Sequence, residues 1–362
     1  MSARQLAASR RSTPSKKALQ ILDPSGSLHG TSPMNEQQLI EALRLMLLSR
    51  LVDERLTKLQ RLGRVGVYGP VHGQEASVIG PAMALDPKLD WIVPASREQP
   101  AMLRHGLPLA NMLAVYMGRI DGGAVPPGVN LLPRQQAIGA QLPHAVGLAW
   151  ALKLRRTGGV VTVYFGEGAS SEGDFHESCN LAGVIGVPLV FVLINNQYAI
   201  STPTHMQTAA QNLSSRAEGY GFPGVAVDGN DLLAVYAASR EAVERARAGD
   251  GPTLIECRTY RVGFHNTSDN PKEYRSEAEV KGAIEQDPIE RVRRLGIHAG
   301  WWSAEEEAKA VAQLSAEVAD AQHKVEQMER PGASAVFDHV YEFPPARFLK
   351  QQADALRSDG SK

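Results

Sequence analysis

The sequence has few cysteines, almost no excess charge and no long apolar run. The two cysteines, Cys179 and Cys257, can form at most one bridge, which excludes a fold held together by a disulfide framework. Lys and Arg number 38 against 39 Asp and Glu, for a net charge of -1, so no global positive field attracts nucleic acid or a membrane surface. The longest apolar stretch, residues 181–194, is interrupted by Gly186 and Pro188 and is too short for a membrane span. We expect neither nucleic-acid nor membrane partners.

The amino-acid composition is typical of a globular chain with a large core, because 43% of the residues are hydrophobic and 21% are charged. We expect a flexible N-terminal tail over residues 1–34, an α/β domain over 35–300 and a helical extension over 301–362. Residues 1–22 are basic and rich in Ser, without an acid. They resemble a mitochondrial transit peptide, but a frayed bacterial tail is the interpretation we favour, with a cytoplasmic location and the mitochondrial matrix as the alternative.

Apolar periodicity predicts the order of the main elements. A long amphipathic helix is expected over residues 35–61, and the Gly- and Pro-rich residues 118–133 are expected to form a loop. Three apolar, β-rich runs then alternate with helical runs, which predicts a parallel sheet buried on both faces. The runs are strands at 160–165, 189–194 and 253–261, and helices at 171–184 and 232–248. The predicted fold class is α/β, a mostly parallel, doubly wound sheet with flanking helices.

The C-terminal region is polar and predicted to be helical. Ser303 and Glu306 have the spacing of a capping box at the start of a long helix, and Pro331 and Gly332 mark its expected end. We expect this helix to lie on the surface or to face a partner.

The segment GEGASSEGD, residues 166–174, follows a predicted strand and precedes a predicted helix. Doubly wound folds bind phosphate groups at this position. A dinucleotide fingerprint would need a glycine where Ser171 stands and an acid at the end of the second strand, where the sequence has Asn195 and Asn196. A nicotinamide-dependent oxidoreductase remains the alternative, although the sequence lacks the usual dinucleotide fingerprint.

Glu167 lies inside this phosphate-binding loop, where a carboxylate would repel a diphosphate. A cation between the two removes the conflict, and Mg²⁺ commonly bridges one or two protein oxygens to substrate phosphates. The amide oxygen of Asn196, at the end of the next parallel strand, can reach the same ion. Alone, Glu167 would be an ordinary exposed loop acid, but the Asn pair at a neighbouring strand end favours a magnesium site.

These residues carry a resemblance to a known family. GEGASSEGD followed by INNQYAIS, residues 194–201, resembles the thiamine-diphosphate motif. More specifically, the chain is similar to the alpha subunit of the decarboxylating first component of 2-oxo acid dehydrogenase complexes. The supporting segments are GVYGPVHGQEA at 66–76, WIVPASRE at 91–98, IGAQLPHAVG at 138–147, VDGND at 227–231 and TYRVGFHNTSDN at 259–270. The resemblance implies a thiamine-diphosphate-binding domain over residues 35–300.

The family holds Mg²⁺ through the acid of the Gly-acid-Gly motif, the second Asn of the pair and a backbone carbonyl two residues later. These positions are Glu167, Asn196 and Tyr198. His265 matches the family's active-site histidine, which stabilises the diphosphate end and the transition states. Asn266 follows it where regulated members carry a phosphorylated serine, so we expect no such switch at this site.

The family's diphosphate contacts map to Arg97 and to the backbone around Gly168 and Ala169. Ser96 replaces a tyrosine often found beside the diphosphate arginine, and we count it among the cofactor-binding residues. Ile138 corresponds to the apolar residue that holds the cofactor in its bent form.

The resemblance also implies partners. Formation of the reactive cofactor in this family requires a glutamate on a separate beta subunit, and no segment of this chain matches it. We expect an α2β2 heterotetramer, inactive without the beta subunit, that passes its acyl group to the lipoyl domain of a dihydrolipoyl acyltransferase. For the substrate, the motifs favour a branched-chain or broad 2-oxo acid range, and pyruvate is the next candidate. A catalytically degenerate, structural alpha-like subunit is the remaining alternative.

Overall fold

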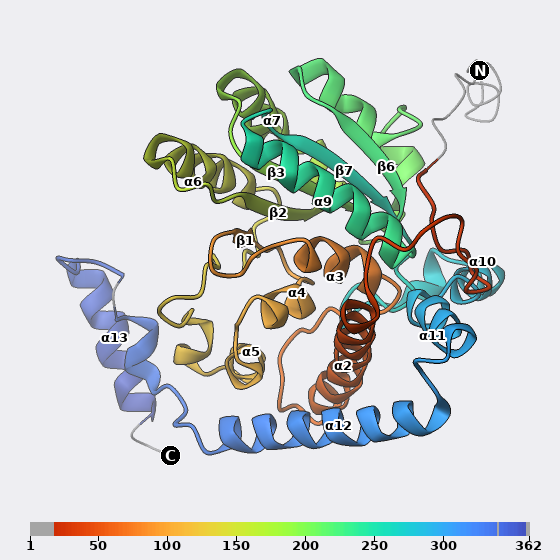
Figure 1. Ribbon diagram of the computed structural model, residues 1–362. Coiled ribbons are helices and arrows are strands. Elements are labelled where there is room, and N and C mark those ends of the chain that lie inside the picture. The colour runs from red at the N-terminus through yellow and green to blue at the C-terminus, as the bar shows by residue number, and fades with distance from the viewer. Residues whose placement is uncertain (1–17, 339, 360–362) are drawn as a thin grey trace, which may run out of the picture.

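The computed structural model describes residues 18–338 and 340–359 and is built around one parallel sheet (Figure 1). All four pairings in the five-stranded sheet are parallel, in the order β1-β2-β3-β7-β6. The strands are β1 (Trp91–Val93), β2 (Val161–Gly166), β3 (Leu189–Asn195), β6 (Gly224–Asp228) and β7 (Thr253–Arg258). The predicted fold class is confirmed. The periodicity analysis did not identify β1 and β6, which are short.

Strand β7 ends at Arg258, three residues before the predicted end at Arg261. Its neighbour β6 ends at Asp228, which lies opposite Arg258, so pairing on that side stops there. On the other side the chain keeps contact with the end of β3, because Thr259 N donates to Asn195 O at 2.9 Å and Arg261 N donates to Asn196 O at 3.3 Å. The segment after β7 is thereby held beside the end of β3.

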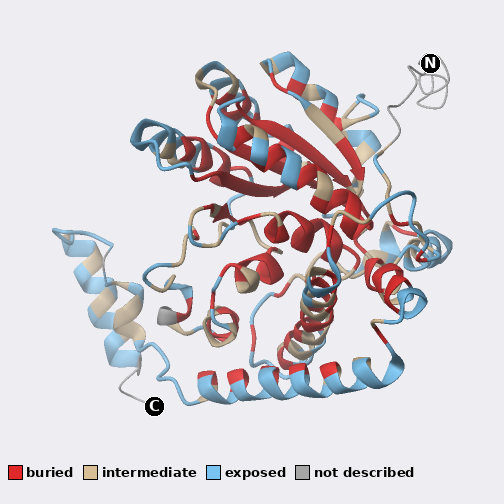
Figure 2. Ribbon diagram, in the orientation of Figure 1, coloured by how far each residue is buried: buried red, intermediate tan, exposed pale blue. Residues whose placement is uncertain are grey.

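Both faces of the sheet are buried, as the continuous apolar strands require (Figure 2). Successive residues of β3 alternate between two cores: Val190 and Val192 belong to one, and Phe191 and Leu193 to the other. The first core includes side chains of α2, α3 and α9, and the second includes side chains of α6 and α7. These helices are α2 (Glu36–Arg61), α3 (Glu75–Met83), α9 (Leu232–Ala248), α6 (Gln141–Arg155) and α7 (Gly173–Ile185).

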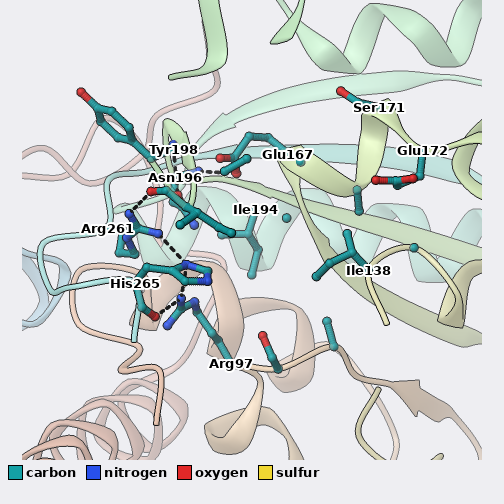
Figure 3. A pocket seen from close by; sticks show the side chains of 18 of the residues that line it. Arg97, Ile138, Glu167, Ser171, Glu172, Ile194, Asn196, Tyr198, Arg261 and His265 are labelled. Carbon is teal, nitrogen blue, oxygen red and sulfur yellow. Dashed lines mark hydrogen bonds between the residues drawn. The ribbon is translucent and has the colours of Figure 1, made fainter. Parts of the chain in front are cut away.

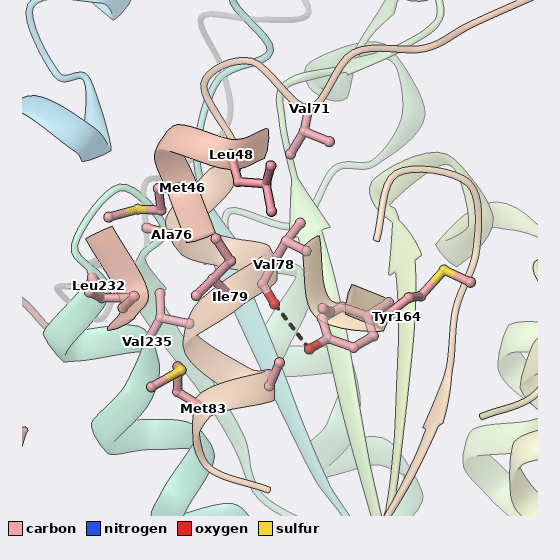
Figure 4. Packing of buried hydrophobic residues seen from close by; sticks show 14 of the residues in the cluster. Met46, Leu48, Val71, Ala76, Val78, Ile79, Met83, Tyr164, Leu232 and Val235 are labelled. Atoms are coloured by element: carbon pink, nitrogen blue, oxygen red, sulfur yellow. Dashed lines mark hydrogen bonds between the residues drawn. The ribbon is translucent and has the colours of Figure 1, made fainter. Parts of the chain in front are cut away.

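Helix α3 packs tightly against α9 and also contacts β3 of the sheet (Figure 4). A Cβ at Gly80 would lie 2.7 Å from Val235 Cγ1, so a larger residue at position 80 would push α9 away. On the sheet side, the Tyr164 hydroxyl donates to Val78 O at 3.1 Å. The two cysteines are free and buried in different cores, which fits their role as small apolar side chains.

The predicted first helix is confirmed, and its start has a local cause. Asn35 accepts from Gln38 N at 2.9 Å while Gln38 Oε1 accepts from Asn35 N at 3.0 Å, which is a complete capping box. The segment before it corrects the prediction of a tail over residues 1–34. Leu22 is fully buried, and Asp231 accepts from the backbone N–H of Ile21 and Leu22. Residues 18–34 thus pack on the body, and residues 1–17 lie outside the described residues.

The C-terminal third is helical, as predicted. Helix α12 (Ala304–Glu326) lies across α2 and α5 (Leu109–Tyr116) and buries one stripe of side chains against them (Figures 1 and 2). Ser303 caps its start by accepting from Glu306 N at 3.2 Å, but the helix ends at Glu326, before the expected stop at Pro331. The helices of this region are α10 (Glu277–Ile284), α11 (Pro288–Ala299), α12 (Ala304–Glu326) and α13 (Ala346–Asp359).

The remaining elements are short and connect the main layers. The predicted loop over residues 118–133 contains one turn of 3₁₀-helix, η1 (Ile120–Gly123), and Leu131 forms a parallel bridge with Ile92 of β1. The short helices are α4 (Gln99–Arg104), α5 (Leu109–Tyr116) and α8 (Thr204–Gln207), and β4 (Tyr198–Ala199) pairs with β5 (Thr202–Pro203) in an antiparallel hairpin. The 3₁₀-helices are η1 (Ile120–Gly123), η2 (Glu167–Ser171), η3 (Leu213–Tyr220), η4 (Pro271–Glu273) and η5 (Ala333–Val336). Within the described ranges, no helix combines the length and apolarity needed to cross a bilayer.

Candidate active site

A pocket of about 550 Å³ opens at the carboxyl ends of β2, β3 and β7 (Figure 3). This is the edge at which open α/β sheets bind ligands. The structure brings together here every site residue named from the sequence. They are Ser96, Arg97, Ile138, Glu167, Gly168, Ala169, Asn196, Tyr198 and His265.

Glu167 follows β2 directly and is 2% exposed. Its Oε2 accepts from Asn196 N at 3.3 Å, so the ends of β2 and β3 are joined at this point. Its Oε1 is buried and has no hydrogen-bond partner among residues 18–338 and 340–359. Burial raises the pKa of Glu167, and backbone hydrogen bonds together with the charges of Arg261 and Arg97 offset this only in part. A carboxylate oxygen in this state is a ready ligand for a cation.

The side chain of Asn196 has a defined orientation. Its Oδ1 accepts from Tyr198 N at 3.2 Å, and its Nδ2 donates to Gln74 Oε1 at 2.9 Å. Tyr198 is fixed from outside the pocket, because its hydroxyl donates to Glu279 Oε1 at 2.8 Å. Across the described ranges, no group of three or more His, Cys, Asp and Glu side chains could hold a metal ion. A cation here would therefore rely on one carboxylate with amide and carbonyl oxygens.

The 3₁₀-helix η2 brings the backbone of Gly168 and Ala169 to the pocket wall. Gly168 packs closely against the β4–β5 hairpin, since a Cβ there would lie 2.9 Å from Ala199 Cβ. Ser170 Oγ donates to Glu167 O at 2.6 Å and stabilises this turn. Ile138 is 63% exposed and lies at the pocket near Ile194 and Glu172 (Figure 3).

Arg97 contributes a guanidinium group held by backbone carbonyls. Nη1 donates to Pro70 O at 2.8 Å, and Nη2 donates to His265 O at 2.6 Å. The adjacent Ser96 lines the pocket, and its carbonyl accepts from Gln99 Nε2 at 3.1 Å. The loop that carries Pro70 is itself held to α2, because Asp53 Oδ2 accepts from Val71 N at 2.9 Å and from His72 N at 3.0 Å.

His265 lies between two guanidinium groups (Figure 3). Its Nδ1 is 3.1 Å from Arg97 Nη2 and 2.9 Å from Arg261 Nη1. A guanidinium can only donate, so Nδ1 must accept and the ring proton of the neutral imidazole is on Nε2. Burial, followed by the charges of Arg97 and Arg261, lowers the pKa of His265 to about 4. The neutral tautomer with a proton on Nε2 is thus the form present near pH 7.

Gln74 and Arg261 are two of the pocket residues that were not identified as site residues from the sequence. Gln74 belongs to the quoted segment 66–76 and Arg261 to the quoted segment 259–270, but a lone Gln or Arg in such a segment predicts no direction for its side chain. Arg261 is 1% exposed and donates through Nη2 to Ile200 O at 2.6 Å and to the Tyr274 hydroxyl at 3.0 Å. The guanidinium of Arg261 adds positive charge to the pocket, whereas Ile194, near the end of β3, is an uncharged lining residue.

Comparison with known proteins agrees with this geometry. Residues 43–334 match the family model described as "Dehydrogenase E1 component". The chain is 40% identical over 337 residues to the pyruvate dehydrogenase E1 component subunit alpha of Staphylococcus aureus (strain Mu50 / ATCC 700699), covering 92% of this chain and 91% of that protein.

Two further relatives carry the same name. The proteins of S. aureus (strain MRSA252) and of S. epidermidis (strain ATCC 12228 / FDA PCI 1200) are each 39% identical over 337 residues, again 92% of this chain and 91% of theirs. The match extends over most of the chain, and its motifs meet in one pocket. The chain belongs to the dehydrogenase E1 component family, the thiamine-diphosphate-dependent enzymes that oxidatively decarboxylate 2-oxo acids.

Proposed function

We propose that the pocket at the carboxyl ends of β2, β3 and β7 holds thiamine diphosphate through Mg²⁺ and serves the decarboxylation of a 2-oxo acid. The observation that carries this proposal is the buried Oε1 of Glu167, which has no hydrogen-bond partner in the described part of the chain. A buried, unpaired carboxylate beside a phosphate-binding turn is unfavourable unless a cation neutralises it.

The oxygen atoms around Glu167 suit Mg²⁺. The ion prefers oxygen ligands in octahedral geometry and commonly uses few protein groups together with substrate phosphates and water. Glu167 Oε1, Asn196 Oδ1 and the backbone oxygen of Tyr198 would hold it. Arg97, Ser96 and the backbone of Gly168 and Ala169 would bind the diphosphate, and Ile138 would pack against the body of the cofactor.

His265 has a defined part in this proposal. With Nδ1 accepting from the two arginines, Nε2–H is the one ring donor that can face a ligand in the pocket. It would donate to the diphosphate end and stabilise negative charge that develops during decarboxylation and acyl transfer. The chemistry supplied by thiamine diphosphate when bound is a nucleophilic carbanion and an electron sink. The protein supplies position and charge.

The pocket needs a second chain to close it. Ile138 is 63% exposed and Ile200 is 57% exposed, and both line the pocket. Exposed apolar side chains at the rim of a polar site indicate a surface that a partner covers. We infer that the beta subunit covers it in an α2β2 heterotetramer, and that the acyl group passes to the lipoyl domain of a dihydrolipoyl acyltransferase. The bacterial origin of the relatives supports a cytoplasmic location.

Pyruvate is the first 2-oxo acid to test as substrate, because the relatives named above are pyruvate dehydrogenase subunits. The motifs resembling branched-chain enzymes make 3-methyl-2-oxobutanoate the second candidate. The value of kcat/KM for each 2-oxo acid, measured on the heterotetramer, decides between them. Equal values would indicate a broad range.

Two experiments test the proposal itself. In calorimetric titrations of the heterotetramer, thiamine diphosphate with Mg²⁺ should bind and NAD should not; the reverse result would favour a nicotinamide-dependent enzyme. In activity assays, the chain alone should be silent and the heterotetramer active. His265→Ala and Glu167→Ala should each abolish that activity. Full activity in both variants would identify a degenerate alpha subunit with a structural role.

A further inference from the structure

The side chain of Gln74 connects helix α3 to the proposed metal site. Gln74 is the residue before α3, lines the pocket and is 1% exposed. Its Oε1 accepts from Asn196 Nδ2 at 2.9 Å. Its Nε2 is buried and has no hydrogen-bond partner within the described segments of the chain. Burying an amide donor without an acceptor costs free energy, so the fold alone does not explain why the Gln74 side chain is placed here.

The orientation of both amides follows from one backbone group. Tyr198 N–H can only donate, so the Asn196 atom 3.2 Å from it must be Oδ1. The other atom of that amide, Nδ2, therefore faces Gln74 and needs an acceptor, which must be Oε1. The unpaired atom of Gln74 is then Nε2, a donor. A flip of either amide would place two donors or two acceptors against each other.

We propose that Gln74 is a positioning residue that keeps Asn196 Oδ1 directed at the metal and donates through Nε2 to a diphosphate oxygen of the cofactor. The proposal rests on the proposed function of the pocket. Glu167 and Gln74 both line the pocket, and Glu167 Oε1 and Gln74 Nε2 are each buried and unpaired in the described segments, one an acceptor and the other a donor. A cation and an anionic oxygen are the two species that satisfy such a pair at once.

Two substitutions separate the two parts of this role. Gln74→Leu removes both the acceptor for Asn196 and the free donor. Gln74→Glu keeps an acceptor for Asn196 Nδ2 but replaces the donor by a negatively charged oxygen. Gln322→Leu is the matched control, because Gln322 is 9% exposed on α12, its Oε1 is also buried and unpaired among the described residues, and it does not line the pocket.

The measurement is calorimetric titration of the heterotetramer with thiamine diphosphate at several Mg²⁺ concentrations. We expect Gln74→Leu to raise both the Kd of thiamine diphosphate and the Mg²⁺ concentration for half-maximal binding by about 10-fold, the range in which residues that orient metal ligands act. Gln74→Glu should raise the Kd of thiamine diphosphate at least as much, because like charges repel, while its Mg²⁺ requirement stays within about 3-fold of wild type. The control should match wild type.

The outcomes are distinct. Wild-type affinity in either Gln74 variant would overturn the proposal, as would a Gln74→Leu variant whose Mg²⁺ requirement is unchanged. The Tm of each heterotetramer without cofactor identifies variants that merely fail to fold, and for these Gln74→Met is measured in place of Gln74→Leu. If wild type itself does not bind thiamine diphosphate with Mg²⁺, the proposed function fails; if it binds and the Gln74 variants bind equally, only this further inference fails.

Discussion

The two walls of the pocket are built in different ways. One wall is the end of the sheet, where Glu167 and Asn196 directly follow β2 and β3 and are joined by the hydrogen bond that Asn196 N donates to Glu167 Oε2 at 3.3 Å. The other wall consists of Arg97, Arg261 and His265, which stand on loops; both guanidinium groups donate to His265, to its Nδ1 and, from Arg97, also to its backbone carbonyl. The sheet fixes the first wall, whereas mutual hydrogen bonds fix the second. Substitutions on the first wall should therefore change metal binding and, through the metal, cofactor binding. Substitutions on the second wall should change contacts to the diphosphate and also the protonation of His265.

The largest effect is expected at the first wall. Glu167→Gln keeps the size of the side chain but removes the negative charge that the cation needs, so the Kd of thiamine diphosphate in the presence of Mg²⁺ should rise by more than about 100-fold. Calorimetric titration of the heterotetramer measures it. Glu172→Gln, an exposed carboxyl at the pocket rim, is the control and should change the Kd less than about 3-fold. Equal Kd values for the two variants would contradict the comparison.

A change at the second wall should alter an acid–base equilibrium. Arg261→Met removes one of the positive charges beside Nδ1, so the pKa of His265 should rise from about 4 toward its ordinary value. Since Arg97 and burial remain, we expect a rise of about one unit. The titration of the His265 ring resonances by NMR in the wild type and the variant measures it.

Arg240→Met, on the exposed side of α9, is the matched control and should leave the pKa of His265 in place. If the pKa of His265 in Arg261→Met equals that of wild type, the charge of Arg261 does not lower the pKa of His265.

A substitution in the framework beneath both walls should lower the free energy of unfolding and hardly change cofactor binding. Tyr164→Phe removes the hydroxyl that donates to Val78 O at 3.1 Å between the sheet and α3. We expect the free energy of unfolding to fall by about 1 kcal/mol, while the Kd of thiamine diphosphate stays within about 2-fold. Urea unfolding measures the first quantity. Tyr341→Phe, at an exposed position, is the control and should change neither.

An effect of similar size is expected in the dependence of stability on pH. Burial, followed by the charge of Arg50, lowers the pKa of His72 to about 4. Because this folded value lies below the unfolded value of about 6.5, the unfolded chain binds more protons and stability is lost as pH falls from about 6.5 to 4. At pH 5.5 the loss from this residue is of order 1 kcal/mol. His72→Gln should lose less stability than wild type between pH 7 and pH 5.5 in urea titrations, and an identical loss would contradict this assignment.

The difference between the walls also explains what could be predicted from the sequence. Glu167 and Asn196 follow long apolar strands, and neighbouring parallel strands end at one edge, so their convergence follows from periodicity and electrostatics. The side chains of Gln74 and Arg261 point into the pocket because of loop packing, such as the hydrogen bond from Arg261 Nη2 to Ile200 O, and no local pattern encodes it. Residues 18–34 pack on the body because buried Asp231 accepts from their backbone, a contact with a sequence separation of 210.

The central claim is that one divalent cation joins Glu167 and Asn196 to the diphosphate. A crystal structure of the heterotetramer with thiamine diphosphate and Mn²⁺, a substitute with a strong anomalous signal, tests it most directly. We predict an anomalous peak within about 2.3 Å of Glu167 Oε1 and Asn196 Oδ1, with diphosphate oxygens completing its ligands. A bound cofactor with no peak between these two side chains, or with the peak at another site, would contradict the account.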